Sequence, residues 1–226
     1  GDSGPYAQKK AYDLLIQSEA GILAVTGTKE SPAKVGVSLT DIGTGLHAYS
    51  GILSALYQRE RTGKGSRIEV TMFEAMVEWM NHPLMYEHFG GKPMQRAGPD
   101  HAIIVPYGRF TAGDGKDVML GIQNEREWAD FCRVVLLQPE LPADPRCCNN
   151  AARVNHREFV DGLVSDVIKK LPTDILLDRL TEAQTTYGQI NSVYDLIEHP
   201  QLKTVPMSVR GRRVDVPASP WAVPWS

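Results

Sequence analysis

At 226 residues with 42% hydrophobic content, the chain is long and apolar enough for one large domain or two modest ones, which excludes a disordered or fibrous protein. A formal net charge of -3 excludes the basic field typical of nucleic-acid binding, and no apolar run approaches the ~20 residues that cross a bilayer. The three cysteines form no CxxC motif and no metal site. We expect a soluble protein of a reducing compartment, the cytoplasm or a mitochondrial matrix, with small molecules or proteins as partners and no metal.

The first part of the chain predicts two helices. One runs from about Tyr12 to Ala20, where Gly21 breaks it. The stretch SLTDIGTGLHAYSG, residues 38 to 51, opens a longer helix from about Asp41 to Arg61, with Gly63 available for a left-handed C-cap. Apolar residues recur along it at intervals of three and four, the spacing of a buried face: Leu46, Tyr49, Ile52, Leu53 and Leu56.

A strand over Arg67 to Thr71 and a helix over Phe73 to Phe89 are expected next. The stretch GGKPMQRAGPDHAIIVPYG then predicts a boundary or a mobile loop at about residues 90 to 100. Its Gly-Pro-Asp turn, followed by His101 and Pro106, is a candidate active-site lid.

The second part mixes strands and helices. Two strands are joined by a turn at Gly113 to Gly115, and a helix follows in EREWADFCRVVL. Amphipathic helices are expected over Asn155 to Leu171 and Thr173 to Ala183, then a short helix before Pro200 and a hairpin around Gly211. The order predicts an α/β or α+β protein. Trp221 and Trp225, beside prolines, are expected to pack on a surface.

Asp41 has two interpretations. Asp is a favoured N-cap, because its carboxylate accepts hydrogen bonds from the first-turn amides. However, Gly43 and Gly45 are poor helix formers in that turn, so something requires a bare backbone there, and close approach of a ligand is one such requirement. Amides at a helix start also form a seat for an anion or a developing oxyanion. The spacing leaves both interpretations open.

Several stretches together resemble the family III CoA-transferases, the group that includes formyl-CoA and carnitine-type CoA-transferases. They are GPYAQKKAYDLLIQSEAGILAVTG, VSLTDIGTGLHAYSGILSALYQRERTGKGSRIEVTMFEA, HAIIVPYGRFTAGDG and NEREW. The resemblance implies part of a Rossmann-like large domain joined to a small α/β domain, in an interlocked homodimer. The implied division is 1–72 for the large domain, 73–97 for a linker, 98–201 for the small domain and 202–226 for a return segment.

The resemblance makes Asp41 the catalytic nucleophile. In the family mechanism its carboxylate attacks an acyl-CoA, and CoA passes through an aspartyl anhydride and an aspartyl-CoA thioester to another acid. We expect a dicarboxylic acid as donor or acceptor. CoA is therefore a substrate, and no permanently bound cofactor is expected. Lys10 and Tyr12 are the implied CoA contacts, and Gly43, Gly98 and His101 the implied substrate or lid residues.

Two alternatives remain. The related α-methylacyl-CoA racemases carry a His-Asp pair where this chain has Tyr12 and Asp13, and a tyrosine with a reference pKa of ~10 is a poor base at neutral pH, which favours a transferase. A noncatalytic acyl-CoA-binding module would use Asp41 only as a cap. The family's N-terminal portion and its closing segment have no counterpart in this sequence, so we expect a piece of a longer protein.

Overall fold

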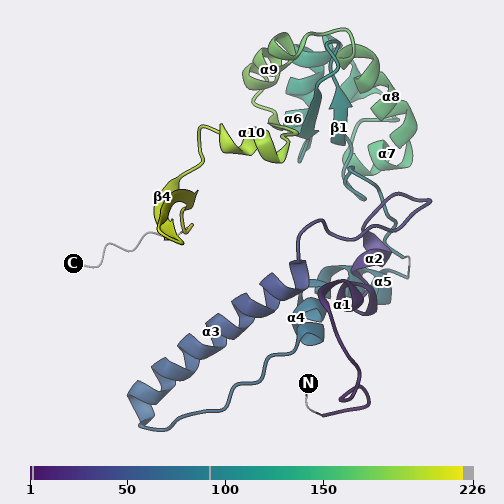
Figure 1. Ribbon diagram of the computed structural model, residues 1–226. Coiled ribbons are helices and arrows are strands. Elements are labelled where there is room, and N and C mark those ends of the chain that lie inside the picture. The colour runs from purple at the N-terminus through teal and green to yellow at the C-terminus, as the bar shows by residue number, and fades with distance from the viewer. Residues whose placement is uncertain (2, 92, 221–226) are drawn as a thin grey trace.

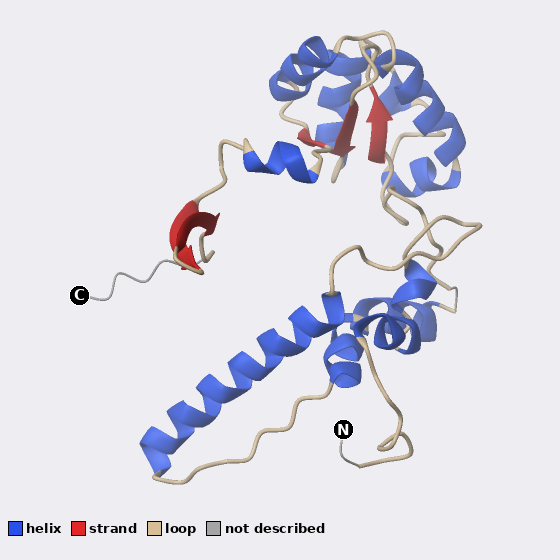
Figure 2. Cartoon of the chain, in the orientation of Figure 1, coloured by secondary structure: helices blue, strands red, loops and turns tan. Residues whose placement is uncertain are grey.

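The computed structural model describes residues 1, 3–91 and 93–220 (Figure 1). Trp221 and Trp225 lie outside these residues. Helices and strands are mixed, as the sequence predicts (Figure 2). The first half is helical, with the elements α1 (Asp13–Glu19), α2 (Ile22–Val25), α3 (Leu39–Thr62), α4 (Met72–Trp79) and α5 (Asn81–Gly90).

The second half begins with a hairpin and continues mainly as helices. Its elements are β1 (Tyr107–Thr111), β2 (Asp117–Gly121), α6 (Glu125–Phe131), η1 (Cys132–Leu136), η2 (Leu141–Ala143), α7 (Asn150–Asn155), α8 (Arg157–Ile168), α9 (Thr173–Glu182), β3 (Thr186–Gln189), α10 (Val193–Ile197), β4 (Thr204–Val209) and β5 (Arg212–Pro217).

The larger hydrophobic core lies between the three-stranded sheet and the helices α6 to α9. The sheet is antiparallel in the order β1-β2-β3, and the paired residues Phe110 and Val118 are both buried. Trp128 and Phe131 of α6 stack at 6.1 Å within this core. The predicted β1–β2 turn is confirmed, with Gly115 in the left-handed region at φ +83°.

A second, smaller core fixes the start of α3. Ile22, Ala75 and Met76 are buried where α1, α2 and α4 meet, and Leu39 packs against them. The rest of α3 extends away from this cluster (Figure 1). It ends at Gly63 in the left-handed conformation, as predicted.

The predicted burial of one face of α3 is wrong for the described chain. Roughly half of each apolar side chain on this face is exposed, because no described element covers the helix along its length (Figure 1). The exposed fractions are Leu46 56%, Tyr49 44%, Ile52 49%, Leu53 47% and Leu56 41%. We call this surface the α3 apolar face.

Two further sequence predictions need correction. The strand expected over Arg67 to Thr71 belongs to neither sheet: residues 64–71 run back along α3 without a ladder partner among the described residues (Figure 1). The helix expected over Phe73 to Phe89 is two helices, broken at Met80. Pro83 explains the break, since it has no amide to donate within a continuous helix but is tolerated in a first turn.

The remaining elements agree with the sequence in kind. The helix expected from Asn155 is present as α7 and α8, which start earlier and are separated at His156. The hairpin around Gly211 is confirmed, and Arg210 and Gly211 have φ values of 51° and 77°, as in the type I′ turn that suits a hairpin. Where the chain divides into domains stays a prediction.

Candidate functional site

Asp41 is the third residue of α3 and is exposed to solvent. The helix starts earlier than predicted, and Ser38 occupies the N-cap position without a side-chain cap bond. Within the described residues, the Asp41 carboxylate accepts no hydrogen bond and forms no ion pair. The interpretation of Asp41 as the N-cap is therefore wrong, and its carboxylate is available for another role.

The cap of α3 comes from a different helix. Asp13, the first residue of α1, accepts hydrogen bonds through Oδ1 from the Thr40 amide at 2.7 Å and, more weakly, from the Asp41 amide at 3.4 Å. The Thr40 hydroxyl donates to the Asp13 carbonyl at 3.3 Å. Asp13 and Thr40 are 27 positions apart in the sequence, so this contact holds α1 against the start of α3.

A buried glutamine fixes the Asp13 carboxylate from its other side. Gln17 is fully buried and donates through Nε2 to Asp13 Oδ2 at 2.7 Å. The Gln17 Oε1 atom accepts from the Val35 amide at 3.0 Å, in the loop that leads to α3. Both carboxylate oxygens of Asp13 are therefore used.

The first amides of α3 do not form the open anion seat expected from the sequence. Thr40 and Asp41 donate to Asp13, while Leu39 donates to the Val37 carbonyl at 2.7 Å. The next amide, that of Ile42, donates to the Ser38 carbonyl at 3.0 Å. An oxyanion would have to displace one of these acceptors.

Gly43 and Gly45 differ in their surroundings. A Cβ on Gly43 would lie 2.7 Å from Met76 Cε and 2.9 Å from Trp79 Cη2, so the crossing of α3 and α4 requires the bare backbone. A Cβ on Gly45 would have no neighbour within 4 Å. Packing thus accounts for Gly43, and its role toward substrate stays a prediction.

Lys10 and Tyr12 are both exposed, on the segment that enters α1. Lys10 lines a cavity of about 990 Å³ between the N-terminal segment, α1 and the start of α4, together with Tyr6 and Lys9. Tyr12 is 71% exposed and precedes α1 in an extended conformation. Their contact with CoA stays a prediction.

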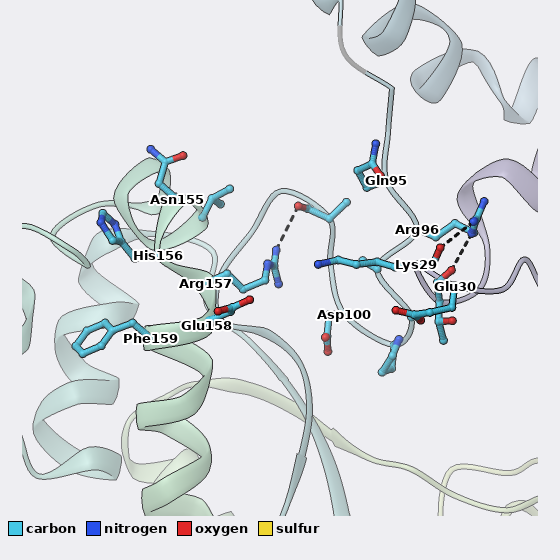
Figure 3. A pocket seen from close by; sticks show the side chains of 16 residues that line it. Lys29, Glu30, Gln95, Arg96, Asp100, Asn155, His156, Arg157, Glu158 and Phe159 are labelled. Atoms are coloured by element: carbon cyan, nitrogen blue, oxygen red, sulfur yellow. Dashed lines mark hydrogen bonds between the residues drawn. The ribbon is translucent and has the colours of Figure 1, made fainter.

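A second cavity, of about 780 Å³, lies between two distant parts of the chain (Figure 3). Lys29, Glu30, Gln95 and Arg96 line one side, and residues 154–159 of α7 and α8 line the other. Gly98 also lines this cavity. Its amide donates a hydrogen bond to the Gly27 carbonyl at 2.8 Å, and its backbone is left-handed, with φ +64°. Neither described cavity includes Asp41.

His101 contacts Tyr107 and Arg157, and its role as a lid residue stays a prediction. Its ring stacks on Tyr107 at 5.2 Å, its amide donates to the Tyr107 carbonyl, and its carbonyl accepts from Arg157 at 2.7 Å. Burial, followed by the positive charge of Arg157, lowers the pKa of His101 and favours the neutral ring.

One face of α7 and α8 fixes the segment that follows His101. Asn150 bonds the Val105 amide at 3.2 Å and the Ile103 carbonyl at 3.0 Å through its side chain. Arg153 donates to the Val105 carbonyl at 2.6 Å, and Arg157 donates to the Ala102 carbonyl at 3.2 Å. The sequence did not single out these residues, because none of them lies in a recognisable motif.

The sequence of the chain is similar to those of known protein families and proteins. The model described as CoA-transferase family III matches residues 1–226. An acetyl-CoA:oxalate CoA-transferase of Acetobacter aceti is 33% identical over 222 residues, which is 97% of this chain and 57% of that protein. The succinyl-CoA:glutarate CoA-transferase of Homo sapiens is 30% identical over 203 residues, 89% of this chain and 46% of that protein. The chain thus spans about half the length of these relatives.

Solved structures agree with this comparison. A CAIB/BAIF family protein from Brucella suis superposes with a TM-score of 0.74 at 35% identity, covering 89% of this chain and 53% of that structure. Rv3272 from M. tuberculosis has a TM-score of 0.80 at 21% identity, a likeness of fold alone, over 99% of this chain and 60% of that structure.

No set of three or more His, Cys, Asp or Glu side chains within the described residues is placed to hold a metal ion. In the same part of the chain, no helix combines the length and the apolar character needed to cross a membrane.

Proposed function

Because the chain belongs to CoA-transferase family III, we propose that the protein transfers CoA from an acyl-CoA donor to a carboxylic acid, with Asp41 as the nucleophile. The observation that carries the proposal is the position of Asp41: exposed, unpaired within the described residues, and fixed on the first turn of a long helix. Relatives named as CoA-transferases support the reaction class.

A dicarboxylic acid is the proposed acyl donor or acceptor. Relatives are named for oxalate, for glutarate and for mesaconate, each of which carries two carboxyl groups. One carboxylate would receive CoA while the second identifies the substrate.

The reaction proceeds in four displacements. An Asp41 oxygen attacks the donor thioester carbonyl and expels CoA thiolate, which leaves an anhydride between Asp41 and the donor acid. The thiolate attacks the Asp41 carbonyl of that anhydride, releasing the donor acid and forming an aspartyl-CoA thioester. The acceptor carboxylate then attacks the Asp41 carbonyl of this thioester and expels CoA thiolate, which leaves a second anhydride between Asp41 and the acceptor acid. The thiolate finally attacks the acceptor carbonyl of this anhydride, which gives the new acyl-CoA and releases the Asp41 carboxylate.

Geometry rather than charge is the main contribution of the protein. Aspartate and glutamate carboxylates form covalent intermediates in other enzymes by direct attack of a carboxylate oxygen, and the same attack is proposed for Asp41. Holding it against the thioester can supply an effective molarity worth ~7 kcal/mol or more. Lys10 and Tyr12 are proposed to bind CoA, and Gly43, Gly98 and His101 to line or cover the substrate.

The proposed architecture is a Rossmann-like large domain and a small α/β domain in an interlocked homodimer, divided at 1–72, 73–97, 98–201 and 202–226. The α3 apolar face supports the proposal that a partner covers this helix. Its apolar side chains are about half exposed, and burying them against another surface would be favourable.

Trapping of the aspartyl thioester tests the function. The protein is incubated with succinyl-CoA and then with hydroxylamine, and the peptide that contains Asp41 is examined by mass spectrometry. We expect a hydroxamate at Asp41, and we expect Asp41→Asn to lose CoA exchange while it still binds CoA. Asp178→Asn, at an exposed aspartate of α9, is the control. Full exchange by Asp41→Asn would reject the proposal, and CoA binding without any exchange by the wild type would indicate a noncatalytic module.

A further inference from the structure

We propose that Asp13 is a positioning residue that keeps the Asp41 carboxylate free by capping α3 in its place. The inference rests on the proposed function, because it concerns how the nucleophile of that reaction is made available. The contacts that carry it are the two hydrogen bonds from the amides of Thr40 and Asp41 to Asp13 Oδ1.

Ser38 and Asp41 have the spacing of a capping box. In this motif the N-cap side chain accepts from the amide three residues later, and the acid at that later position accepts from the N-cap residue. Ser38 occupies the N-cap and Asp41 the third helical position, yet neither side chain makes these bonds. The first turn of α3 therefore has a local cap available that it does not use.

The same chain uses this local cap at other helices. At α10, Ser192 and Asp195 form a complete capping box, with the Ser192 amide donating to Asp195 at 2.8 Å. At α4, the Glu74 amide donates to the Thr71 hydroxyl at 3.2 Å, and that hydroxyl donates to the Glu74 carboxylate at 2.8 Å. The acid of each pair is occupied by its own helix start.

Asn124 and Glu127 at α6 repeat the arrangement. The Glu127 amide donates to the Asn124 side chain at 3.0 Å, and the Glu127 carboxylate accepts from the Gln123 amide at 2.8 Å and from Asn124 at 2.7 Å. The start of α3 differs from these starts because a distant aspartate supplies the acceptor.

The contacts of Asp13 are arranged for a fixed role. Gln17 is fully buried and holds the second carboxylate oxygen of Asp13, while its own carbonyl oxygen receives the Val35 amide. The carboxylate thus joins α1, the loop before α3 and the first turn of α3. Loss of Asp13 would leave the Thr40 and Asp41 amides without their acceptor, and the Asp41 carboxylate would turn back onto the Ser38 amide.

The test compares Asp13→Ala and Asp13→Asn with the wild type in the full-length protein. For Asp13→Ala we expect kcat and the single-turnover rate of hydroxylamine trapping to fall roughly 10- to 100-fold, with KM for the acyl-CoA changed less than about twofold. Asp13→Asn keeps one oxygen for the Thr40 amide and should retain an intermediate rate. The final extent of trapping should stay near one group per chain, which separates slow chemistry from unfolded protein.

A second substitution distinguishes capture of Asp41 from a general structural defect. Ser38 has φ -72°, which proline accepts, and Ser38→Pro removes the amide that the freed Asp41 carboxylate would bind. We expect Ser38→Pro to restore the trapping rate in the Asp13→Ala background. Asp195→Ala, which removes the capping acid of α10, is the matched control and should leave the rate unchanged.

The outcomes separate this inference from the proposed function. An unchanged trapping rate in Asp13→Ala, or a loss that Ser38→Pro does not restore, overturns the positioning role while transfer by the wild type stands. Failure of the wild type to form the Asp41 hydroxamate instead overturns the proposed function. A reduced rate with full final trapping, restored by Ser38→Pro, supports both.

Discussion

The guanidinium of Arg153 is completely buried and lies 2.6 Å from a carboxylate oxygen of Glu125, joining α7 to the start of α6. The same guanidinium donates to the carbonyls of Val105 and Cys147 and lies 5.1 Å from the Trp128 ring. A buried cation is tolerated here because each of these contacts replaces lost water. The arrangement fixes the segment after His101 to the larger core.

Arg153→Met should lower the free energy of unfolding by about 2–4 kcal/mol, because it leaves buried carbonyls without donors and leaves Glu125 without its positively charged partner. Denaturant unfolding measures this change. Arg133→Met is the matched control, since Arg133 pairs with Asp130 on the surface of the same region and should cost less than about 1 kcal/mol. Equal losses in the two variants would contradict the role given to burial.

Gly43→Ala and Gly45→Ala should change stability in opposite directions. The new methyl at 43 meets the rigid Trp79 ring, which should cost about 1–3 kcal/mol, while the methyl at 45 meets nothing and should gain up to about 1 kcal/mol from helix propensity. Thermal unfolding of the two variants provides the comparison. A stabilised Gly43→Ala would show that α4 can move away without cost.

Local signals in the sequence predicted the parts of the fold that depend on few residues. Gly63 ends α3 and the turn at Gly211 forms a hairpin, because a left-handed glycine acts through its own backbone. The predicted burial of the α3 apolar face and the strand expected over Arg67 to Thr71 were wrong for the described residues. Burial and strand pairing both need a second surface, and a periodic pattern does not say which surface that is.

The candidate site divides in the same way. Asp41 was identified from its place at a helix start and from the family resemblance, but its cap was not. Asp13 reaches Thr40 across 27 residues of sequence, and a contact of that range leaves no periodic or motif signal in one chain. The hydrogen bonds from Asn150, Arg153 and Arg157 to backbone carbonyls of residues 101–105 were not predicted for the same reason.

Asp161 should make stability depend on pH. Burial raises its pKa from 3.8 to about 6, against the opposing charge of Arg157 at 3.7 Å. Between about pH 4 and pH 6, the folded state therefore keeps a proton on Asp161 that the unfolded state has released. The contribution of Asp161 to stability is largest below about pH 4 and is lost as the pH rises through about 6.

Asp161→Asn removes this titration. The free energy of unfolding, measured from pH 4 to 7, should fall with pH in the wild type relative to the variant, by at most about 3 kcal/mol. Asp178→Asn, at an exposed position of α9, is the control and should follow the wild type. Parallel curves for wild type and Asp161→Asn would show that the Asp161 carboxylate is hydrated in the folded protein.

The α3 apolar face should control self-association if the proposed homodimer forms through it. Leu46 and Leu53 lie seven residues apart on this face and are 56% and 47% exposed, so glutamates there would be charges placed inside a dimer interface. Leu46→Glu combined with Leu53→Glu should convert the dimer to monomer in sedimentation velocity at micromolar concentration. Gln58→Glu, at an exposed polar position near the end of α3, should leave the dimer intact. A double variant that stays dimeric would place the interface elsewhere. Burying two glutamates of each chain in the interface would make dimer formation less favourable by several kcal/mol, on the order of the cost of burying unpaired charges.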